Sequence, residues 1–189
     1  MYDVAVIGCG IVGAAAAYEL SRYNCRVLVL EAKNDVANVT TKANSAILHA
    51  GYDPTPGTLM AETNVRGVAL AKELCEKLDV EREEIGSLVL AFGEEDERHL
   101  EKLYQQGLAN GVPGIELLTA DEVHALEPNV SDKVTAALYA PTAAIVSPWE
   151  YALALAETAV VNGCELRLSA PVTGIDRSGE GYRLHTPKG

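Results

Sequence analysis

Three glycines near the N-terminus have the spacing of a phosphate-binding turn. They belong to the segment Gly8-Cys9-Gly10-Ile11-Val12-Gly13, which has the pattern G-x-G-x-x-G. In such a turn the first glycine permits a sharp bend, the second lets a pyrophosphate approach the backbone, and the third lets a helix pack closely on a strand. A helix that begins there, at Ile11 and Val12, offers free N–H groups and the positive end of its dipole to the pyrophosphate. The chemistry indicated is the binding of an adenine dinucleotide.

One acidic side chain fits the same ligand. Glu31 lies eighteen residues beyond Gly13, at the expected end of the second strand. A carboxylate there accepts hydrogen bonds from ribose hydroxyls and repels a 2′-phosphate, so NADP is the poorest ligand. FAD and NAD share the ADP half, and the motif leaves both open. Cys9 is interpreted as a small residue in the turn, because no basic residue near it in the sequence would activate its thiol.

The motif needs a strand before it and a helix after it, and the chain supplies both. Residues 2–7 are predicted to form an apolar strand, residues 11–23 an Ala-rich helix and residues 26–30 a second strand. Residues 32–57 are rich in Thr, Asn, Gly and Pro and are predicted to form a long loop with at most a short helix. A loop of this length inside a compact domain is usually functional. In a compact NAD domain a helix of ordinary length would come next, so the loop favours FAD.

The remaining segments alternate between helices and strands. Helices are predicted at residues 58–78 and 94–110, at the capping-box pattern Thr119–Glu122, and from an N-cap at Ser147 to Gly163. Strands are predicted at residues 87–92, 135–140, 164–168, 172–175 and 182–186, the last two as a hairpin. These segments indicate an α/β fold in which a parallel sheet, including the strands around residues 88 and 135, carries an inserted lobe.

The composition disfavours several classes of protein. With 189 residues, 48% hydrophobic and 22% charged, the chain is long enough for one sizeable core, or one core with a small lobe. The net charge of −12 argues against a nucleic-acid partner and an anionic membrane surface. No apolar run is long enough to span a bilayer and no signal peptide is visible, so a cytoplasmic protein is expected. The four cysteines show no CxxC pairing, which suits reduced thiols and gives no support for a metal site.

A family resemblance rests on the glycine motif together with the loop that follows Glu31. The segment Thr40-Thr41-Lys42-Ala43-Asn44-Ser45, which leads to His49-Ala50-Gly51, resembles the D-amino-acid-oxidase-type superfamily of FAD-dependent oxidoreductases. Within it the likeness is greatest to glycerol-3-phosphate dehydrogenases and L-2-hydroxyglutarate oxidases, and residues 145–159 share it. The resemblance implies a Rossmann-like FAD-binding domain of the glutathione-reductase type with a partial substrate-side lobe. Residues 1–57 and about 141–189 would bind the cofactor, and residues 58–140 would form the inserted part.

The resemblance also implies which further residues touch FAD. Contacts with the ribose, the pyrophosphate and the ribityl chain are implied for Ala32, Thr40, Thr41, Asn44 and Ser45. Val172, in the first strand of the hairpin, would bind the adenine edge through its backbone. His49 would lie near the flavin ring, although a loop histidine that braces its own turn explains it equally well. The residues around it differ from those of relatives that attach flavin covalently.

The function implied is the oxidation of a CH–OH or CH–NH group by hydride transfer to flavin, with glycerol 3-phosphate as the first candidate substrate. L-2-Hydroxyglutarate or an amino acid are alternatives, as are an NAD-binding module and an inactive fragment. No catalytic residue is assigned, because His99, His124 and His185 suit surface or packing positions. The chain stops on a turn with an open hairpin edge, so a truncated N-terminal portion is expected, inactive by itself. A redox partner, or self-association through the surface left open, is a further expectation.

Overall fold

The chain folds as two compact units, which the computed structural model describes over residues 1–187. Unit 1 comprises Met1–Ser45 together with the chain from Ser147 onward, and unit 2 comprises Ala46–Val146. Unit 2 is therefore an insertion into unit 1. The chain passes from unit 1 to unit 2 after Ser45 and returns to unit 1 at Ser147. The sequence predicts these boundaries near residues 57 and 141.

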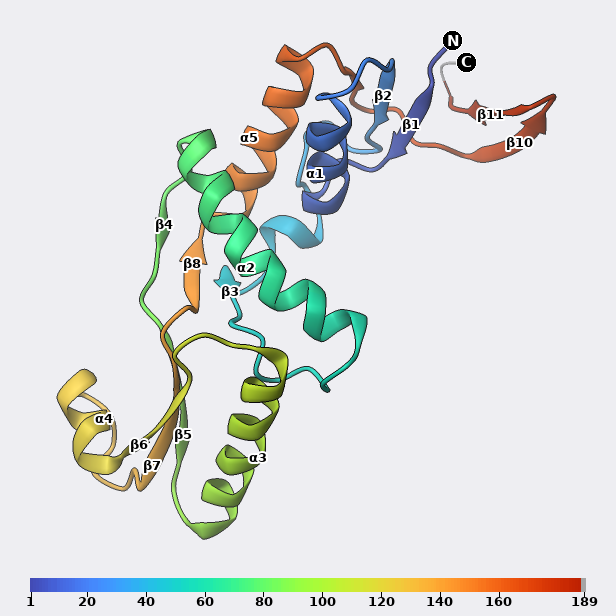
Figure 1. Ribbon diagram of the computed structural model, residues 1–189. Helices are drawn as coiled ribbons and strands as arrows, with labels where there is room; N and C mark the ends of the chain where they lie inside the picture. The colour runs from blue at the N-terminus through green and yellow to red at the C-terminus, as the bar shows by residue number, and fades with distance from the viewer. Residues whose placement is uncertain (188–189) are drawn as a thin grey trace. The chain divides into compact units, whose positions relative to one another are not determined.

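Unit 1 is built on a parallel three-stranded sheet. The strands lie in the order β1 (Val4–Ile7), β2 (Val27–Leu30) and β9 (Glu165–Arg167). All four residues of the central strand β2 are buried, as is typical of a parallel strand with neighbours on both edges. Helix α1 (Ile11–Leu20) connects β1 to β2, and helix α5 (Pro148–Val161) leads into β9 (Figure 1). The strand–helix–strand unit predicted around the glycine motif is present.

Helices α1 and α5 pack against each other through alanines. Their buried alanines are Ala14, Ala17, Ala152, Ala156 and Ala159. Side chains this small let two helix axes approach closely. At the C-terminal ends of the helices, Asn162 Nδ2 donates to Ser21 Oγ at 3.1 Å. Pro148 occupies the first turn of α5 as predicted, but the Ser147 side chain makes no capping hydrogen bond, which corrects that part of the prediction.

The C-terminal part of unit 1 is a hairpin. Strands β10 (Gly174–Ser178) and β11 (Gly181–His185) pair antiparallel, and Gly179 supplies the positive φ of 62° that their tight turn needs. Val172 lies before β10 rather than within the hairpin strand. It is half-buried and packs against a small cluster with Leu28 and Ala170.

Unit 2 contains a three-stranded sheet whose strand direction differs from the one predicted from the sequence. Strands β5 (Ser87–Ala91), β7 (Ala136–Ala140) and β6 (Glu116–Thr119) lie in that order and pair antiparallel. The prediction of a parallel sheet around residues 88 and 135 is therefore wrong. An apolar run indicates a strand but not its direction, which depends on the path of helices α3 (Glu94–Asn110) and α4 (Ala120–Leu126) between the strands.

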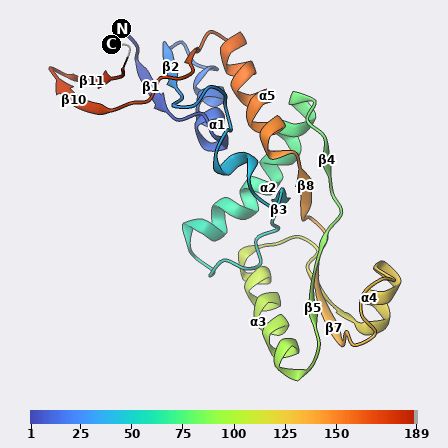
Figure 2. The same ribbon diagram turned by 180° about the vertical axis from the view of Figure 1, so that it is seen from behind.

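The two helices cover opposite faces of this sheet (Figure 2). Successive side chains of a strand point to opposite faces, so neighbouring residues of β7 enter different clusters. Leu138 packs in one cluster with Leu100 and Leu103 of α3. Ala137 packs in the other cluster with Val123 of α4. Unit 2 thus has its own core.

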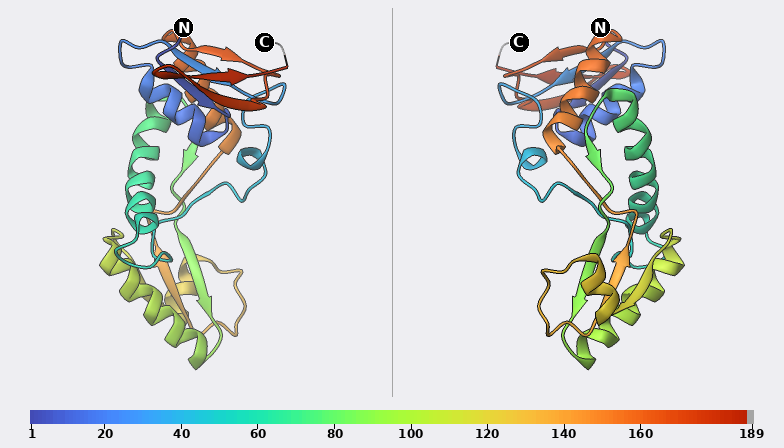
Figure 3. Two further views of the ribbon diagram at one scale, coloured as in Figure 1. Left: turned by 90° about the vertical axis from the view of Figure 1, so that its right-hand side faces the viewer. Right: turned by 90° about the vertical axis from the view of Figure 1, so that its left-hand side faces the viewer.

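The rest of unit 2 consists of one long helix and three very short strands (Figure 3). Helix α2 (Leu59–Leu78) begins at Thr58, whose hydroxyl accepts from Ala61 N–H at 3.3 Å. Strands β3 (Ile47–Leu48), β8 (Ala144–Val146) and β4 (Arg82–Glu83) form an antiparallel sheet in that order. None of these strands is predicted from the sequence, because runs of two or three residues carry no measurable periodicity.

The capping box of α4 is confirmed and yields a stability prediction. Thr119 Oγ1 accepts from Glu122 N–H at 3.4 Å, and Glu122 Oε2 accepts from Thr119 N–H at 2.8 Å. The backbone N–H of Thr119, followed by its hydroxyl, holds the pKa of Glu122 below its usual value. We expect Thr119→Ala to lower the free energy of unfolding by about 1 kcal/mol in urea titrations, since one end of the box is lost. Thr119→Ser keeps the hydroxyl and should match the parent; equal stability of all three proteins would contradict a role for the cap.

Candidate functional site

The glycine turn brings β1 and α1 together at very short range. Gly8 has a φ of 93°, which favours glycine, and its N–H donates to Leu30 O at 2.8 Å. A Cβ on Gly13 would lie 2.0 Å from Gly8 O. The turn and the first helical residues therefore form a single backbone unit anchored to the end of β2.

Thr41 caps helix α1 from a distant part of the chain. Gly10, the N-cap residue of α1, has no side chain to satisfy the first free N–H group. Instead Thr41 Oγ1 accepts from Ile11 N–H at 3.1 Å, and a Cβ on Gly10 would lie 3.0 Å from that oxygen. Because the Thr41 oxygen accepts this bond, the hydroxyl proton is free to point toward another acceptor.

Glu31 holds the turn through both of its carboxylate oxygens. The side chain is only 7% exposed. Its Oε2 accepts from Cys9 N–H at 2.7 Å, and its Oε1 accepts from Lys33 N–H at 2.8 Å. Each oxygen keeps a further lone pair for a ribose hydroxyl. We call these two hydrogen bonds of Glu31 the clamp on the glycine turn. The clamp is not predicted from the sequence, although an acid at the end of the strand beside the turn is the feature that indicates it.

Cys9 is packed in the turn as a neutral thiol. It is buried, and this burial, with the Glu31 carboxylate adding to it, raises the pKa of the thiol to about 11. At neutral pH the thiol is therefore protonated, and a protonated thiol is a poor nucleophile. This environment suits a small packing residue.

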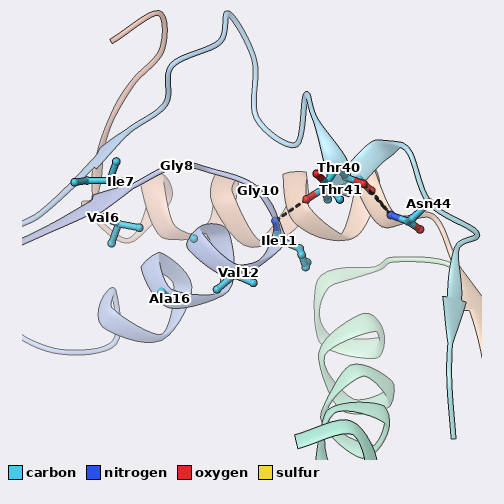
Figure 4. Close-up of a pocket in the computed structure, with 11 residues that line it drawn as sticks. Val6, Ile7, Gly8, Gly10, Ile11, Val12, Ala16, Thr40, Thr41 and Asn44 are labelled. Atoms are coloured by element: carbon cyan, nitrogen blue, oxygen red, sulfur yellow. Dashed lines mark hydrogen bonds between the residues drawn. The ribbon is translucent and has the colours of Figure 1, made fainter. Parts of the chain in front are cut away.

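A cavity of about 580 Å³ opens beside the turn (Figure 4). Its walls are the backbone of the turn, the first turn of α1 and the side chains of Thr40, Thr41 and Asn44. Asn44 Nδ2 donates to Thr41 O at 2.7 Å, which holds the 310-helix η1 (Thr40–Lys42) beside the cavity. None of the described residues that line it carries a carboxylate. Helix N–H groups, hydroxyls and an amide are donors that suit a pyrophosphate.

The structure gathers eight of the candidate site residues at this cavity and leaves five elsewhere. The residues that line it are Gly8, Gly10, Ile11, Val12, Gly13, Thr40, Thr41 and Asn44. Glu31 lies behind the turn. Ala32 and Ser45 are exposed and Val172 is half-buried, and none of the three lines the cavity.

His49 belongs to unit 2. There it lines a separate cavity of about 190 Å³ with Met60 and Asn64, whose Oδ1 is buried without a hydrogen-bond partner in residues 1–187. Over the same residues, no group of three or more His, Cys, Asp or Glu could hold a metal ion. The helices of this part of the chain are all too short or too polar to cross a membrane.

Comparison with known proteins decides between the dinucleotides. Residues 3–189 match the family described as FAD dependent oxidoreductase. The chain belongs to this family. FAD is therefore the cofactor to which the donors around the glycine turn correspond, and the NAD alternative is not supported.

The relatives point to a narrower group within the FAD-dependent oxidoreductases. The chain is 50% identical over 188 residues to a glycerol 3-phosphate dehydrogenase of Caloramator mitchellensis, covering 100% of this chain and 39% of that protein. It is 34% identical over 149 residues to a mitochondrial L-2-hydroxyglutarate dehydrogenase of Dictyostelium discoideum, covering 77% of this chain and 33% of the relative.

A solved structure supports the same placement. The FAD-bound L-α-glycerophosphate oxidase of Mycoplasma pneumoniae has a TM-score of 0.92 and 32% identity, covering 100% of this chain and 50% of that one. The α/β FAD-binding fold predicted from the sequence is thus confirmed. The chain spans half or less of the length of these proteins.

Thr41 gives a direct test of the cavity. We expect Thr41→Val to lower the affinity of the chain for FAD about tenfold, because Ile11 N–H loses its acceptor and the phosphate loses a hydroxyl donor. Fluorescence titration of FAD measures the change. Thr41→Ser retains the hydroxyl and should bind as the parent does. Equal affinity of the valine variant would show that the hydroxyl does not contact the cofactor.

Proposed function

We propose that the whole protein is an FAD-dependent dehydrogenase or oxidase that oxidises glycerol 3-phosphate. The observation that carries this proposal is the 50% identity over 100% of this chain to a glycerol 3-phosphate dehydrogenase. The likeness to a glycerophosphate oxidase with FAD bound supports it. L-2-Hydroxyglutarate is the second candidate substrate, favoured by the 34% identity to its dehydrogenase.

In this proposal the chain binds and orients the cofactor. Bound FAD supplies the acceptor for the hydride that leaves the CH–OH carbon. The free N–H groups of α1 and the Thr41 hydroxyl bind the pyrophosphate, with Thr40 and Asn44 beside them at the same cavity. Glu31 receives the adenosine ribose on the lone pairs that the clamp leaves free.

Four further contacts remain part of the proposal. Ala32 and Ser45 extend the ribose and ribityl contacts, Val172 binds the adenine edge through its backbone, and His49 lies near the flavin ring. Support comes from the family membership and from the match of the glycine and His49-Ala50-Gly51 segments to its pattern.

We also propose that the protein works in the cytoplasm on a small-molecule substrate. All four cysteines are free, and three of them are buried, which is consistent with a reducing compartment. A redox partner that accepts the electrons, or self-association of this portion, stays a prediction.

The first experiment concerns the cofactor. The chain is mixed with FAD, separated from excess by gel filtration and examined for the visible flavin band, with a parallel NAD titration. Retained flavin without NAD affinity supports the proposal. NAD binding without flavin would contradict it, and binding of neither would show that the cofactor needs protein segments outside this chain.

The second experiment concerns the substrate. The full-length protein is loaded with FAD, and bleaching of the flavin band is followed under anaerobic conditions with glycerol 3-phosphate, L-2-hydroxyglutarate and glycine. The proposal requires the highest kcat/KM for glycerol 3-phosphate. A higher value for L-2-hydroxyglutarate would assign the protein to the second candidate.

A further inference from the structure

Unit 2 contains a charged cavity that the dinucleotide site does not use. Its volume is about 220 Å³, and it is lined mainly by residues of α2, by β4 with the residue that follows, and by the connection between β7 and β8. Four of its lining residues are polar, namely Lys72, Arg82, Glu84 and Thr142. None of them lies among the residues of the cavity beside the glycine turn.

Arg82 carries a nearly buried guanidinium with N–H groups that remain unused. Its side chain is only 10% exposed, and its Nη2 donates to Glu84 Oε2 at 2.5 Å. That bond uses one of the five N–H groups of a guanidinium. Within residues 1–187 the side chain has no other protein acceptor. Because burying an arginine with few acceptors is costly, an oxygen ligand in the cavity would relieve a real deficit.

Thr142 provides a second, independent deficit at the same cavity. Its Oγ1 is buried and has no hydrogen-bond partner in the described chain. A buried hydroxyl without a partner is destabilising, because it has lost its hydrogen bonds to water. The guanidinium donates and the hydroxyl can donate, so both groups suit an acceptor that carries more than one oxygen.

The charge of the cavity selects the number of negative charges on the ligand. Lys72 and Arg82 contribute two positive charges and Glu84 one negative charge, since Lys72 Nζ lies 3.4 Å and Arg82 Nη2 2.5 Å from Glu84 Oε2. The Arg82 hydrogen bond holds the pKa of Glu84 below its usual value, so its carboxylate stays ionised. The net charge of plus one favours a monoanion, because Glu84 repels a ligand with two full negative charges more strongly than one with a single charge.

The remaining wall is apolar. Val65, Val68 and Pro113 line the cavity together with alanines. At roughly 30 Å³ for a water-sized group, 220 Å³ holds about seven non-hydrogen atoms. A carboxylate with a chain of a few carbons fills this space and buries its chain against the valines.

We propose that this cavity binds a short-chain aliphatic monocarboxylate. The carboxylate accepts from the Arg82 guanidinium and the Thr142 hydroxyl, Lys72 adds attraction at the rim, and the alkyl chain packs on Val65 and Val68. The site is independent of the proposed oxidoreductase function, since its residues all belong to unit 2 and the glycine turn belongs to unit 1.

The test uses the whole chain and n-valerate as the probe, titrated by isothermal calorimetry and by amide chemical shifts. We expect saturable binding of valerate, with n-butylamine and inorganic phosphate binding at least about tenfold more weakly. If butylamine bound as tightly as valerate, the cavity would select ligands by their apolar chain alone, which would contradict the proposal. Tighter binding of phosphate would overturn the choice of a carboxylate, and no saturable binding of valerate would overturn the site.

Two variants separate binding from folding. Thr142→Val removes an unpartnered hydroxyl, so its midpoint in urea should equal or exceed that of the parent, while its Kd for valerate rises about fivefold. Arg82→Lys keeps the charge but loses the planar fork, and we expect its Kd to rise about tenfold. Unchanged affinity for valerate in both variants would show that valerate binds elsewhere and would contradict the proposal. FAD titration of the same variants should give the parent affinity.

Discussion

Replacement of Gly13 by alanine is expected to weaken FAD binding by this chain at least about 100-fold and to destabilise unit 1. The added Cβ would lie 2.0 Å from Gly8 O, 3.0 Å from Gly8 C and 3.4 Å from a Val6 methyl group. Two of these atoms belong to the backbone of the turn, which is anchored to Leu30 O and cannot rotate away. Helix α1 must therefore shift from β1.

The shift has two measurable consequences. Overpacking of this kind costs about 1–3 kcal/mol, and more where backbone atoms clash, which urea unfolding will report. A displacement of the α1 N-terminus by about 1 Å should weaken FAD binding at least 100-fold, because the N–H groups no longer point at the pyrophosphate.

Gly67→Ala is the matched control. Gly67 lies in α2, and a Cβ there would meet no atom within 4 Å. The same substitution should therefore leave FAD binding unchanged and stabilise the helix by about 0.5–1 kcal/mol. If Gly13→Ala behaved like Gly67→Ala, the close contact of helix and turn would be refuted.

Replacement of Glu31 by glutamine is expected to loosen the glycine turn. The carboxylate accepts two backbone N–H bonds, from Cys9 and from Lys33, and glutamine can supply an oxygen to only one of them. The other N–H would face an NH2 group in a site that is 7% exposed. We expect a loss of about 1.5–3 kcal/mol in the free energy of unfolding, the range for hydrogen bonds to a charged group.

The affinity of the Glu31→Gln protein for FAD should also fall, by at least about tenfold, because the substitution changes both the glycine turn and the acceptor for the ribose. Glu19→Gln is the control in the same unit, since Glu19 is exposed and forms a surface ion pair with Arg22. Its stability should change by less than about 0.5 kcal/mol. A Glu31→Gln protein as stable as the Glu19→Gln protein would show that the clamp contributes nothing.

Local signals predicted the helices and the turn correctly. Thr119 and Glu122 predicted a capping box, and both of its hydrogen bonds are present. Gly8 predicted a sharp turn after an apolar strand, and its φ of 93° is the conformation that glycine favours. Both signals depend on residues within a few positions of each other, so both can be recognised in a single sequence without knowledge of the fold.

Such local signals do not identify contacts between residues that lie far apart in the sequence. Ile11 and Thr41 are thirty residues apart, and only the folded chain shows that a threonine hydroxyl replaces the missing side chain of Gly10. The direction of β7 against β5 was predicted wrongly as parallel, because Leu138 and Ala137 alternate between two faces in either orientation.

The sequence by itself therefore determined the glycine motif and an adenine dinucleotide as the class of ligand, since the types and spacing of the glycines and of the acid after β2 suit the pyrophosphate and the ribose. The tertiary structure alone decided which donors surround the turn, that Glu31 clamps it, and that Arg82 and Thr142 meet at one cavity in unit 2. These are contacts between segments far apart in the chain, and burial rather than spacing selects them.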